Sequence, residues 1–248
     1  ELFVQEYDPG RGALTGVPVP LKPRYALNGR APGDAAVIWS PDGRFLAYLA
    51  KGNTKTLRSN GLVIRSLETG EEISVPVRQS LFFYQLAWSP DQTRFVVAGN
   101  DESGIPGVFV VDRRSGADRR LANLDAPESV TADPAWLPDG RTILFKRKDR
   151  EQPTVFHLLL ASLETGSEQI LHSGFHMTWL KLSADGQRIA FVKNLGADRV
   201  LMIQELDGGA IRELVRVKAP KTLVDVNWDP HSSFLIYVER NGRANELW

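Results

Sequence analysis

The chain of 248 residues contains no cysteine, so disulfide bonds, thiolate metal ligands and thiol nucleophiles are all excluded. It also lacks any apolar run close to the roughly 18 residues that a membrane-spanning helix requires, and we expect no direct insertion into a membrane. Neither sign of charge predominates, because 30 basic residues balance 30 acidic residues. Nucleic-acid-binding proteins usually carry a basic excess, so we expect no nucleic-acid partner.

Helical periodicity is missing as well. No window of about 11 residues keeps apolar side chains at helical spacing without an interrupting Gly or Pro. The chain begins at Glu1, and no signal peptide is visible. We therefore interpret it as a processed or trimmed piece of a longer product that folds as a single domain over residues 1–248.

What the sequence does contain is a repeat. The stretch WSPDGRFLAYLA at Trp39 recurs as WSPDQTRFVVAG at Trp88, WLPDGRTILFKR at Trp136, LSADGQRIAFVK at Leu182 and WDPHSSFLIYVE at Trp228. Successive copies begin 46 to 49 residues apart. A fixed period of this length indicates a repeat architecture, and this period is typical of a propeller blade.

Each copy predicts the same four antiparallel strands. A first strand ends at the Trp, Ser-Pro-Asp-Gly makes a tight turn, and a second strand rich in β-branched and aromatic residues follows. A third strand, a Gly-containing turn and a fourth strand complete the unit. These last parts are GLVIRSLETGEEISV (61–75), GVFVVDRRSGADRRL (107–121), VFHLLLASLETGSEQIL (155–171) and VLMIQELDGGAIREL (200–214).

The five copies resemble the TolB-type, WD40-like propeller repeat, whose hallmark is the W-S-P-D-G turn followed by an I-A-F/Y strand. The resemblance implies an all-β propeller with a binding role, often at the bacterial cell envelope, and therefore a periplasmic or extracytoplasmic location. Two copies depart from the pattern. The fourth has Leu182 for Trp and Ala184 for Pro, and the fifth has His231-Ser232 in its turn, which should differ in detail.

The two ends of the chain predict how the ring closes. Residues 1–21 read as a third and a fourth strand without the first two, and the fifth copy stops after its second strand. We expect five blades, the last shared between both termini, because this arrangement leaves no free sheet edge. The alternative is six blades with part missing, because ELW (246–248) resembles ELF (1–3) and would begin another third strand.

The central channel is the sharpest candidate site. First strands lie innermost in a propeller, so the residues one and three positions before each motif Trp should face the channel. The polar and aromatic members of this set are Gln85, Asp133, Trp179, Lys181, Asp225 and Asn227. They predict either a small polar pocket with an aromatic wall or a solvated network of ion pairs.

Two aromatic segments precede first strands and are candidates for a partner-binding surface. Their candidate residues are Phe82, Phe83, Tyr84, Phe175 and His176. Exposed aromatic side chains are enriched at protein interfaces, although the same residues could cover the core between blades. We expect these segments to share one mouth of the ring with the polar pocket.

No sequence motif for catalysis or metal binding is present. A zinc site needs three or four converging ligands, and His172 and His176 have no third candidate nearby. A G-x-S-x-G elbow is absent as well, since HSGFH (172–176) lacks the glycine two residues before the serine. We therefore expect no cofactor, no metal ion and no catalytic residue.

The sequence thus predicts a monomeric, non-catalytic propeller that binds a protein or peptide partner on one face of the ring. The alternative is a propeller that binds a small molecule or carbohydrate, and is possibly an enzyme, through the polar channel pocket. The two differ in what they should expose: an apolar or aromatic patch at a mouth, or an enclosed pocket with converging carboxylates.

Overall fold

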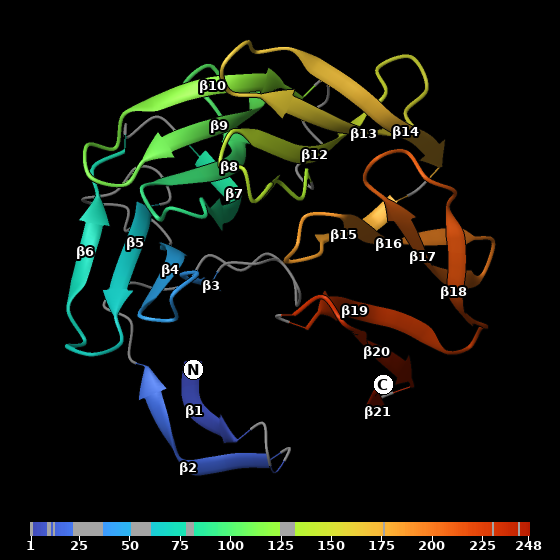
Figure 1. Ribbon diagram of the computed structural model, residues 1–248, viewed down its shortest axis with the longest axis horizontal. Helices are drawn as coiled ribbons and strands as arrows, with labels where there is room; N and C mark the ends of the chain where they lie inside the picture. The colour runs from blue at the N-terminus through green and yellow to red at the C-terminus, as the bar shows by residue number, and fades with distance from the viewer. Residues whose placement is uncertain are drawn as a thin grey trace.

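The computed structural model describes residues 2–8, 11, 13–21, 37–50, 61–77, 82–124, 132–175, 177–229, 231–242 and 244–248. Over these ranges the chain forms β-strands and no helix, so none of the described residues forms a helix that could cross a membrane. The strands are arranged as the blades of a propeller around a ring (Figure 1). The all-β propeller prediction is confirmed, with one blade for each of the five sequence repeats.

Each blade is an antiparallel sheet whose strands follow chain order. The first blade contains β3 (Val37–Trp39), β4 (Phe45–Ala50), β5 (Gly61–Ser66) and β6 (Glu72–Val75). The second contains β7 (Phe82–Trp88), β8 (Arg94–Asn100), β9 (Pro106–Asp112) and β10 (Asp118–Asn123). The third contains β11 (Ala135–Trp136), β12 (Thr142–Lys148), β13 (Val155–Ser162) and β14 (Glu168–Phe175). The fourth contains β15 (Met177–Leu182), β16 (Arg188–Leu195), β17 (Asp198–Glu205) and β18 (Arg212–Val217), and the fifth contains β19 (Thr222–Trp228), β20 (Leu235–Asn241) and β21 (Ala244–Leu247).

The closure of the ring differs from the predicted shared blade. The strand that pairs with β20 is β21, from the C-terminal end, and it occupies the place predicted for the N-terminal strand. β1 (Leu2–Asp8) and β2 (Ala13–Leu21) pair with each other as a separate two-stranded sheet. In Figure 1 this hairpin lies between the first blade and the fifth blade. Residues 244–247 thus form the third strand of the fifth blade, and the similarity of ELW to ELF predicts a third strand at this end of the chain.

The motif turns are held by their own side chains. The hydroxyl of Ser40 donates to Asp42 at 2.6 Å and accepts the backbone N–H of Phe45 at 2.9 Å, while Asp42 also accepts the N–H of Arg44. Gly43 has a φ of 71°, a conformation that glycine adopts without strain. In the fifth turn Asp229 replaces the serine and accepts the N–H of Phe234, and Ser232 takes the positive φ. The predicted difference in this turn is thus confirmed.

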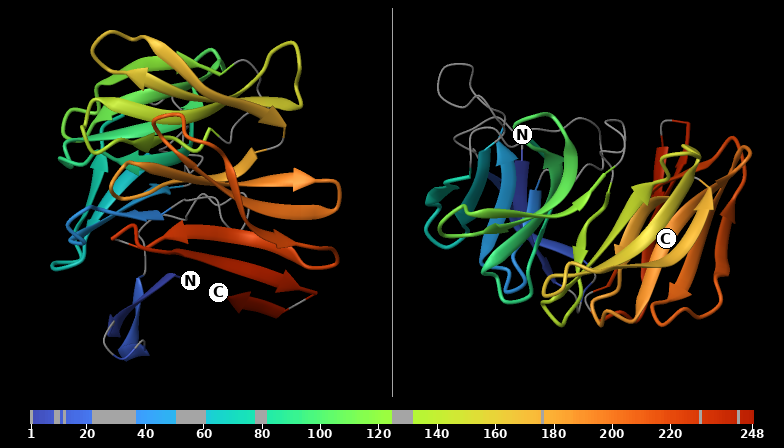
Figure 2. Two further views of the ribbon diagram at one scale, coloured as in Figure 1. Left: turned by 45° about the vertical axis from the view of Figure 1, so that its right-hand side comes forward. Right: turned by 90° about the horizontal axis from the view of Figure 1, so that it is seen from above.

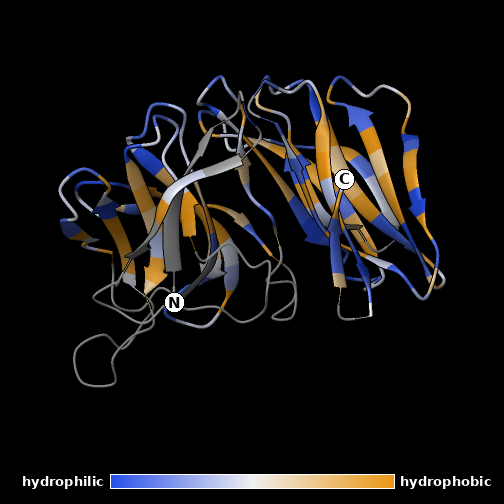
Figure 3. Ribbon diagram, turned by 90° about the horizontal axis from the view of Figure 1, so that it is seen from below, coloured by the Kyte–Doolittle hydropathy of each residue, from blue (hydrophilic) through white to orange (hydrophobic). Residues whose placement is uncertain are grey.

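The hydrophobic core lies between blades. Four clusters of buried side chains each combine strands of two neighbouring blades, so every blade depends on the next for its burial. The blades lie side by side around the ring in both views of Figure 2. Figure 3 shows hydrophobic residues along the strands and hydrophilic residues in most of the connecting turns.

A repeated contact fastens the second blade to the third and the fourth blade to the fifth. At both junctions an arginine six positions after the start of one motif lies over the motif Trp of the following blade. Arg94 lies 5.0 Å from the centre of the Trp136 ring, and Arg188 lies 4.9 Å from that of Trp228. Both arginines also donate to a carbonyl in the turn of the following blade.

Candidate functional site

The central channel contains a cavity of about 490 Å³ at its turn-side mouth. Its wall comes from the first strands of four blades, which lie nearest the middle of the ring in Figure 1. Pro41, Pro90 and Pro138, each from a motif turn, stand at the rim. Positions one before the motif Trp supply Ile38, Ala87, Ala135 and Lys181, as the alternation along these strands predicts.

Asp133 is the centre of a polar network on the cavity wall. Its Oδ1 accepts a 2.6 Å hydrogen bond from the side-chain amide of Gln85, whose carbonyl oxygen accepts the N–H of Asp133 at 2.9 Å. Its Oδ2 accepts from Lys146 Nζ at 2.7 Å and, more weakly, from the N–H of Leu180 at 3.4 Å. One carboxylate therefore joins the second, third and fourth blades.

Lys146 is a functional neighbour that the sequence analysis missed. Its side chain is 3% exposed, and its ammonium group also donates to the carbonyl oxygen of Met177 at 3.2 Å. A signal was available in the repeat. Lys146 is the only charged residue ten positions after the start of a motif; the other four copies have Leu49, Ala98, Val192 and Val238 there.

Lys181 differs from Lys146 because no described carboxylate neutralises its ammonium group. It is half-buried on the cavity wall, and it makes no ion pair or side-chain hydrogen bond with any described residue. Only its backbone carbonyl is engaged, as an acceptor for the indole N–H of Trp228 at 3.1 Å. The cavity thus combines an apolar wall, a neutralised Asp133 network and one cation that is available to a ligand.

β-Bulges in the first strands decide which predicted residues reach the cavity. A bulge inserts an extra residue and turns the following side chains to other directions. The pairing register shifts between Phe83 and Gln85, between Thr178 and Lys181, and between Leu223 and Asp225.

Trp179 lies within the second of these bulges. It has a φ of 50°, a rare conformation for a bulky residue, and it packs against the hydrophobic cluster between the fourth and fifth blades. The structure therefore brings Gln85, Asp133 and Lys181 together but does not add Trp179 to their wall.

Asp225 and Asn227 also lie apart from the cavity lining. Asn227 is exposed and donates to Asp225 at 3.3 Å, while the other carboxylate oxygen of Asp225 accepts the N–H of Val226. These two residues form a local pair on β19.

The predicted aromatic segments lie at the other end of the first strands. Phe82 and Phe83 begin β7, whereas the cavity rim is at the Trp88 end. The side chains of Phe82, Phe83, Tyr84 and Phe175 and the whole of His176 lie outside the described residues. The topology alone separates their mouth of the ring from the cavity, contrary to the expectation of one shared mouth.

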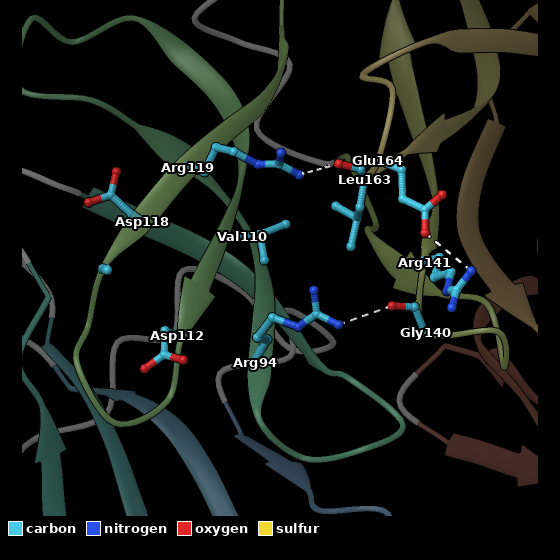
Figure 4. A pocket seen from close by; sticks show the side chains of 10 residues that line it. Arg94, Val110, Asp112, Asp118, Arg119, Gly140, Arg141, Leu163 and Glu164 are labelled. Carbon is cyan, nitrogen blue, oxygen red and sulfur yellow. Dashed lines mark hydrogen bonds and ion pairs between the residues drawn. The ribbon is translucent and has the colours of Figure 1, made fainter.

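A second cavity, of about 530 Å³, lies on the outside between the second and third blades. Figure 4 shows how its polar groups are used. Arg94 donates to the carbonyl of Gly140, Arg119 donates to that of Leu163, and Arg141 pairs with Glu164. Because Arg94 and Arg119 already hold the second blade to the third and Arg141 is paired within the third blade, this groove is better suited to fastening blades than to binding a ligand.

Among the described residues, no three or more His, Asp or Glu side chains converge as a metal ion would require.

A third cavity, of about 910 Å³ between the first two blades, is lined in part by Arg113. The Arg113 guanidinium lies 4.6 Å from the centre of the Phe45 ring and 5.2 Å from that of Trp88. Burial lowers the pKa of Arg113, and the nearby Asp42 opposes that shift.

Comparisons with known proteins agree on the fold. A family model described as TolB beta propeller domain matches residues 29–248. A search of curated proteins found no match.

Solved structures with a similar fold serve several functions. TolB from Acinetobacter baumannii superposes with a TM-score of 0.68 at 21% identity, over 86% of this chain and 50% of that one. An oligogalacturonate lyase in complex with manganese superposes with a TM-score of 0.65 at 15% identity, over 99% of this chain and 68% of that one. A structure from an analysis of two prolyl endopeptidases superposes with a TM-score of 0.58 at 16% identity, over 79% of this chain and 31% of that one. This chain thus spans half the length of the Acinetobacter TolB, and identities this low show the fold alone.

Proposed function

Because the chain belongs to the TolB β-propeller family, we propose that its channel is a non-catalytic binding site that holds a peptide segment of a protein partner at the turn-side mouth. The observation that carries this proposal is the Lys181 ammonium in the wall of the 490 Å³ cavity, which has no ion-pair partner among the described residues. Binding pockets typically combine an apolar lining with a few convergent polar groups. Lys181 would pair with a carboxylate of the peptide, either an acidic side chain or a C-terminus.

The chemistry of Asp133 favours binding over catalysis. A general acid or base must reach the proton that it transfers. Both oxygens of Asp133 are already occupied, by Gln85 on one side and by Lys146 and Leu180 on the other. This carboxylate is therefore suited to fixing the positions of three first strands, so that the cavity is formed before a ligand arrives.

The cavity wall favours a peptide over a carbohydrate. A sugar site needs an exposed aromatic face for stacking. Trp179 packs toward the core between blades, and Trp88 and Trp136, which reach the cavity, are each only 7% exposed. Family membership also leads us to propose a monomeric domain in the periplasm or another extracytoplasmic compartment.

Selection from a displayed library of random peptides tests this proposal. We expect the selected peptides to share an acidic residue or to require a free C-terminus. Their binding should fall at least tenfold with Lys181→Glu and stay unchanged with Lys218→Glu, a matched charge reversal at an exposed lysine. Peptides that bind both variants equally would contradict the proposed site. Selective binding of oligosaccharides instead would favour the carbohydrate alternative.

A further inference from the structure

The outer half of the third blade carries a Ser–His–Asp arrangement that the channel does not use. His157 on β13 and Ser173 on β14 face each other as direct cross-strand partners. The Ser173 Oγ lies 2.7 Å from His157 Nδ1, and Asp149 Oδ2 lies 2.8 Å from His157 Nε2. Nucleophile, base and orienting carboxylate are thus in hydrogen-bonding sequence, as in a catalytic triad, but the two imidazole nitrogens exchange the partners that they have in the serine proteases.

The carboxylate of this group is held in place and ionised. Its other oxygen, Asp149 Oδ1, accepts the backbone N–H groups of Glu151 at 2.8 Å and Gln152 at 2.7 Å. The hydrogen bond from His157 is the largest of the causes that hold the pKa of Asp149 below its ordinary value, followed by these backbone donors. An ionised Asp149 selects the imidazole tautomer with its proton on Nε2. Nδ1 is then left with the lone pair that can accept the serine proton.

The nucleophile is open to solvent while its partners are partly covered. Ser173 is exposed, whereas the side chains of His157 and Asp149 are 19% and 27% exposed. β14 is the outermost strand of its blade, so no further strand of that sheet covers its free edge (Figure 1). The three residues line none of the three cavities described above. A substrate would have to be small and unhindered, because this surface offers little to hold a larger one.

We propose that Ser173, His157 and Asp149 form a second site that transfers small acyl groups from esters to Ser173 and then to water. The Ser173 Oγ attacks the ester carbonyl, its proton passes to His157 Nδ1, and the ester C–O bond breaks as the leaving alcohol takes that proton. A water molecule then attacks the acyl carbon and gives a proton to His157, the bond between the acyl carbon and Ser173 Oγ breaks to release the acid, and His157 returns the proton to Oγ. The net reaction is ester plus water to acid plus alcohol, and it requires no other reactant.

Hydrolysis of p-nitrophenyl acetate by the whole chain, combined with covalent labelling by a fluorophosphonate, tests this proposal. We expect an acyl-enzyme detectable by intact mass and a label located on Ser173 by peptide mapping. Positioned general-base catalysis typically contributes about a hundredfold or more, so Ser173→Ala and His157→Gln should each lower the rate at least tenfold. Asp149→Ala should lower it as well, because the imidazole loses the group that fixes its tautomer.

Two controls separate this site from background reactivity. Free histidines hydrolyse activated esters without any triad, so His231→Gln, at an exposed histidine, measures that contribution and should leave the rate and the label unchanged. Ser167→Ala, at another exposed serine of the same blade, should also change neither. The proposal is overturned if Ser173→Ala keeps the wild-type rate, or if the label spreads over several residues in the wild-type chain. Thermal unfolding of each variant confirms that it is folded.

Discussion

At the scale of single residues, the network around Asp133 contains a buried ion pair with Lys146 at 2.7 Å. A lysine that is 97% buried is tolerated because a carboxylate at 2.7 Å and a backbone carbonyl at 3.2 Å replace its water. Removing one partner of such a pair leaves the other charge without compensation, which costs more than the pair itself contributes.

Lys146→Met should therefore lower the free energy of unfolding by about 3 kcal/mol. The side chain keeps its length, so the loss reports the uncompensated Asp133 rather than a cavity. Urea unfolding of this variant, beside Lys148→Met on the same strand, measures it. Lys148 makes no ion pair or side-chain hydrogen bond with a described residue and should change stability by less than about 0.5 kcal/mol. Equal losses in the two variants would refute the role of the network.

The motif turns predict an acid-sensitive fold. Hydrogen bonds from the preceding serines, Ser40 and Ser183, are the largest cause that keeps the pKa values of Asp42 and Asp185 below their ordinary value, and backbone N–H groups add to it. A pKa that is lower in the folded state than in the unfolded state stabilises the fold above the unfolded value of about 3.9. This stabilisation is lost as the pH falls through the lower, folded value.

The free energy of unfolding should thus fall steeply below about pH 4. In Ser40→Ala the free energy of unfolding should fall less between neutral and acidic pH, because the folded-state pKa of Asp42 then lies closer to its ordinary value. Comparing urea unfolding at about pH 7 and about pH 3 measures the difference. Ser167→Ala, whose hydroxyl contacts Thr165 rather than a carboxylate, is the control and should keep the full acid loss. An unchanged acid loss in Ser40→Ala would show that the turn is not its source.

At the scale of the element, the first motif residue of the second to fifth blades packs at the interface with the preceding blade. Where this residue is Trp136 or Trp228, the residue opposite it is an arginine, and where it is Leu182 the corresponding residue is Thr142. Trp39 begins the first blade, and it is 54% exposed. Phe234 takes the position of Arg94 and Arg188 in the fifth blade, and it is 57% exposed.

The same substitution should therefore have different effects at two equivalent positions. Trp88→Ala removes a ring that is 7% exposed and tilted against Phe95, and it should cost about 3–5 kcal/mol. Trp39→Ala should cost less than about 1 kcal/mol, because its ring is largely in solvent. Thermal or urea unfolding of the two variants measures the contrast. Similar losses at both positions would mean that Trp39 is packed in solution.

Element types and turn positions could be predicted from the sequence because the repeat carries them five times. The side-chain directions before the bulges could not. Alternation along β15 predicts that Trp179 faces the channel, but the bulge between Thr178 and Lys181 turns it toward the core. A bulge is set by the pairing register with the neighbouring strand, and the sequence of one strand alone does not determine that register. Lys146 was missed for a different reason, since a charged residue in a hydrophobic strand is ordinarily exposed.

At the scale of the whole molecule, stability comes from the contacts between neighbouring blades. The four hydrophobic clusters join the five blades in series, whereas the hairpin of β1 and β2 forms its own sheet. Closure was the part of the architecture that strand counting could not decide, because residues 1–3 and 246–248 fit the same strand position equally well.

Deleting residues 1–21 should consequently leave one cooperative unfolding transition. Its midpoint should change much less than in Trp88→Ala, because the deletion removes no strand that pairs with the five blades. Differential scanning calorimetry of the truncated chain measures both quantities. Loss of cooperativity, or aggregation of the truncated chain, would instead support a blade shared between the two termini.

The central claim is that the channel mouth binds a carboxylate-bearing peptide through Lys181, and a charge-swap titration tests it most directly. Isothermal titration of a selected acidic peptide should give binding to the wild type and at least tenfold weaker binding to Lys181→Glu. A peptide with lysine in place of its acidic residue should restore binding to Lys181→Glu alone. Equal affinity of the acidic peptide for both proteins, with no rescue by the swapped peptide, would contradict the claim.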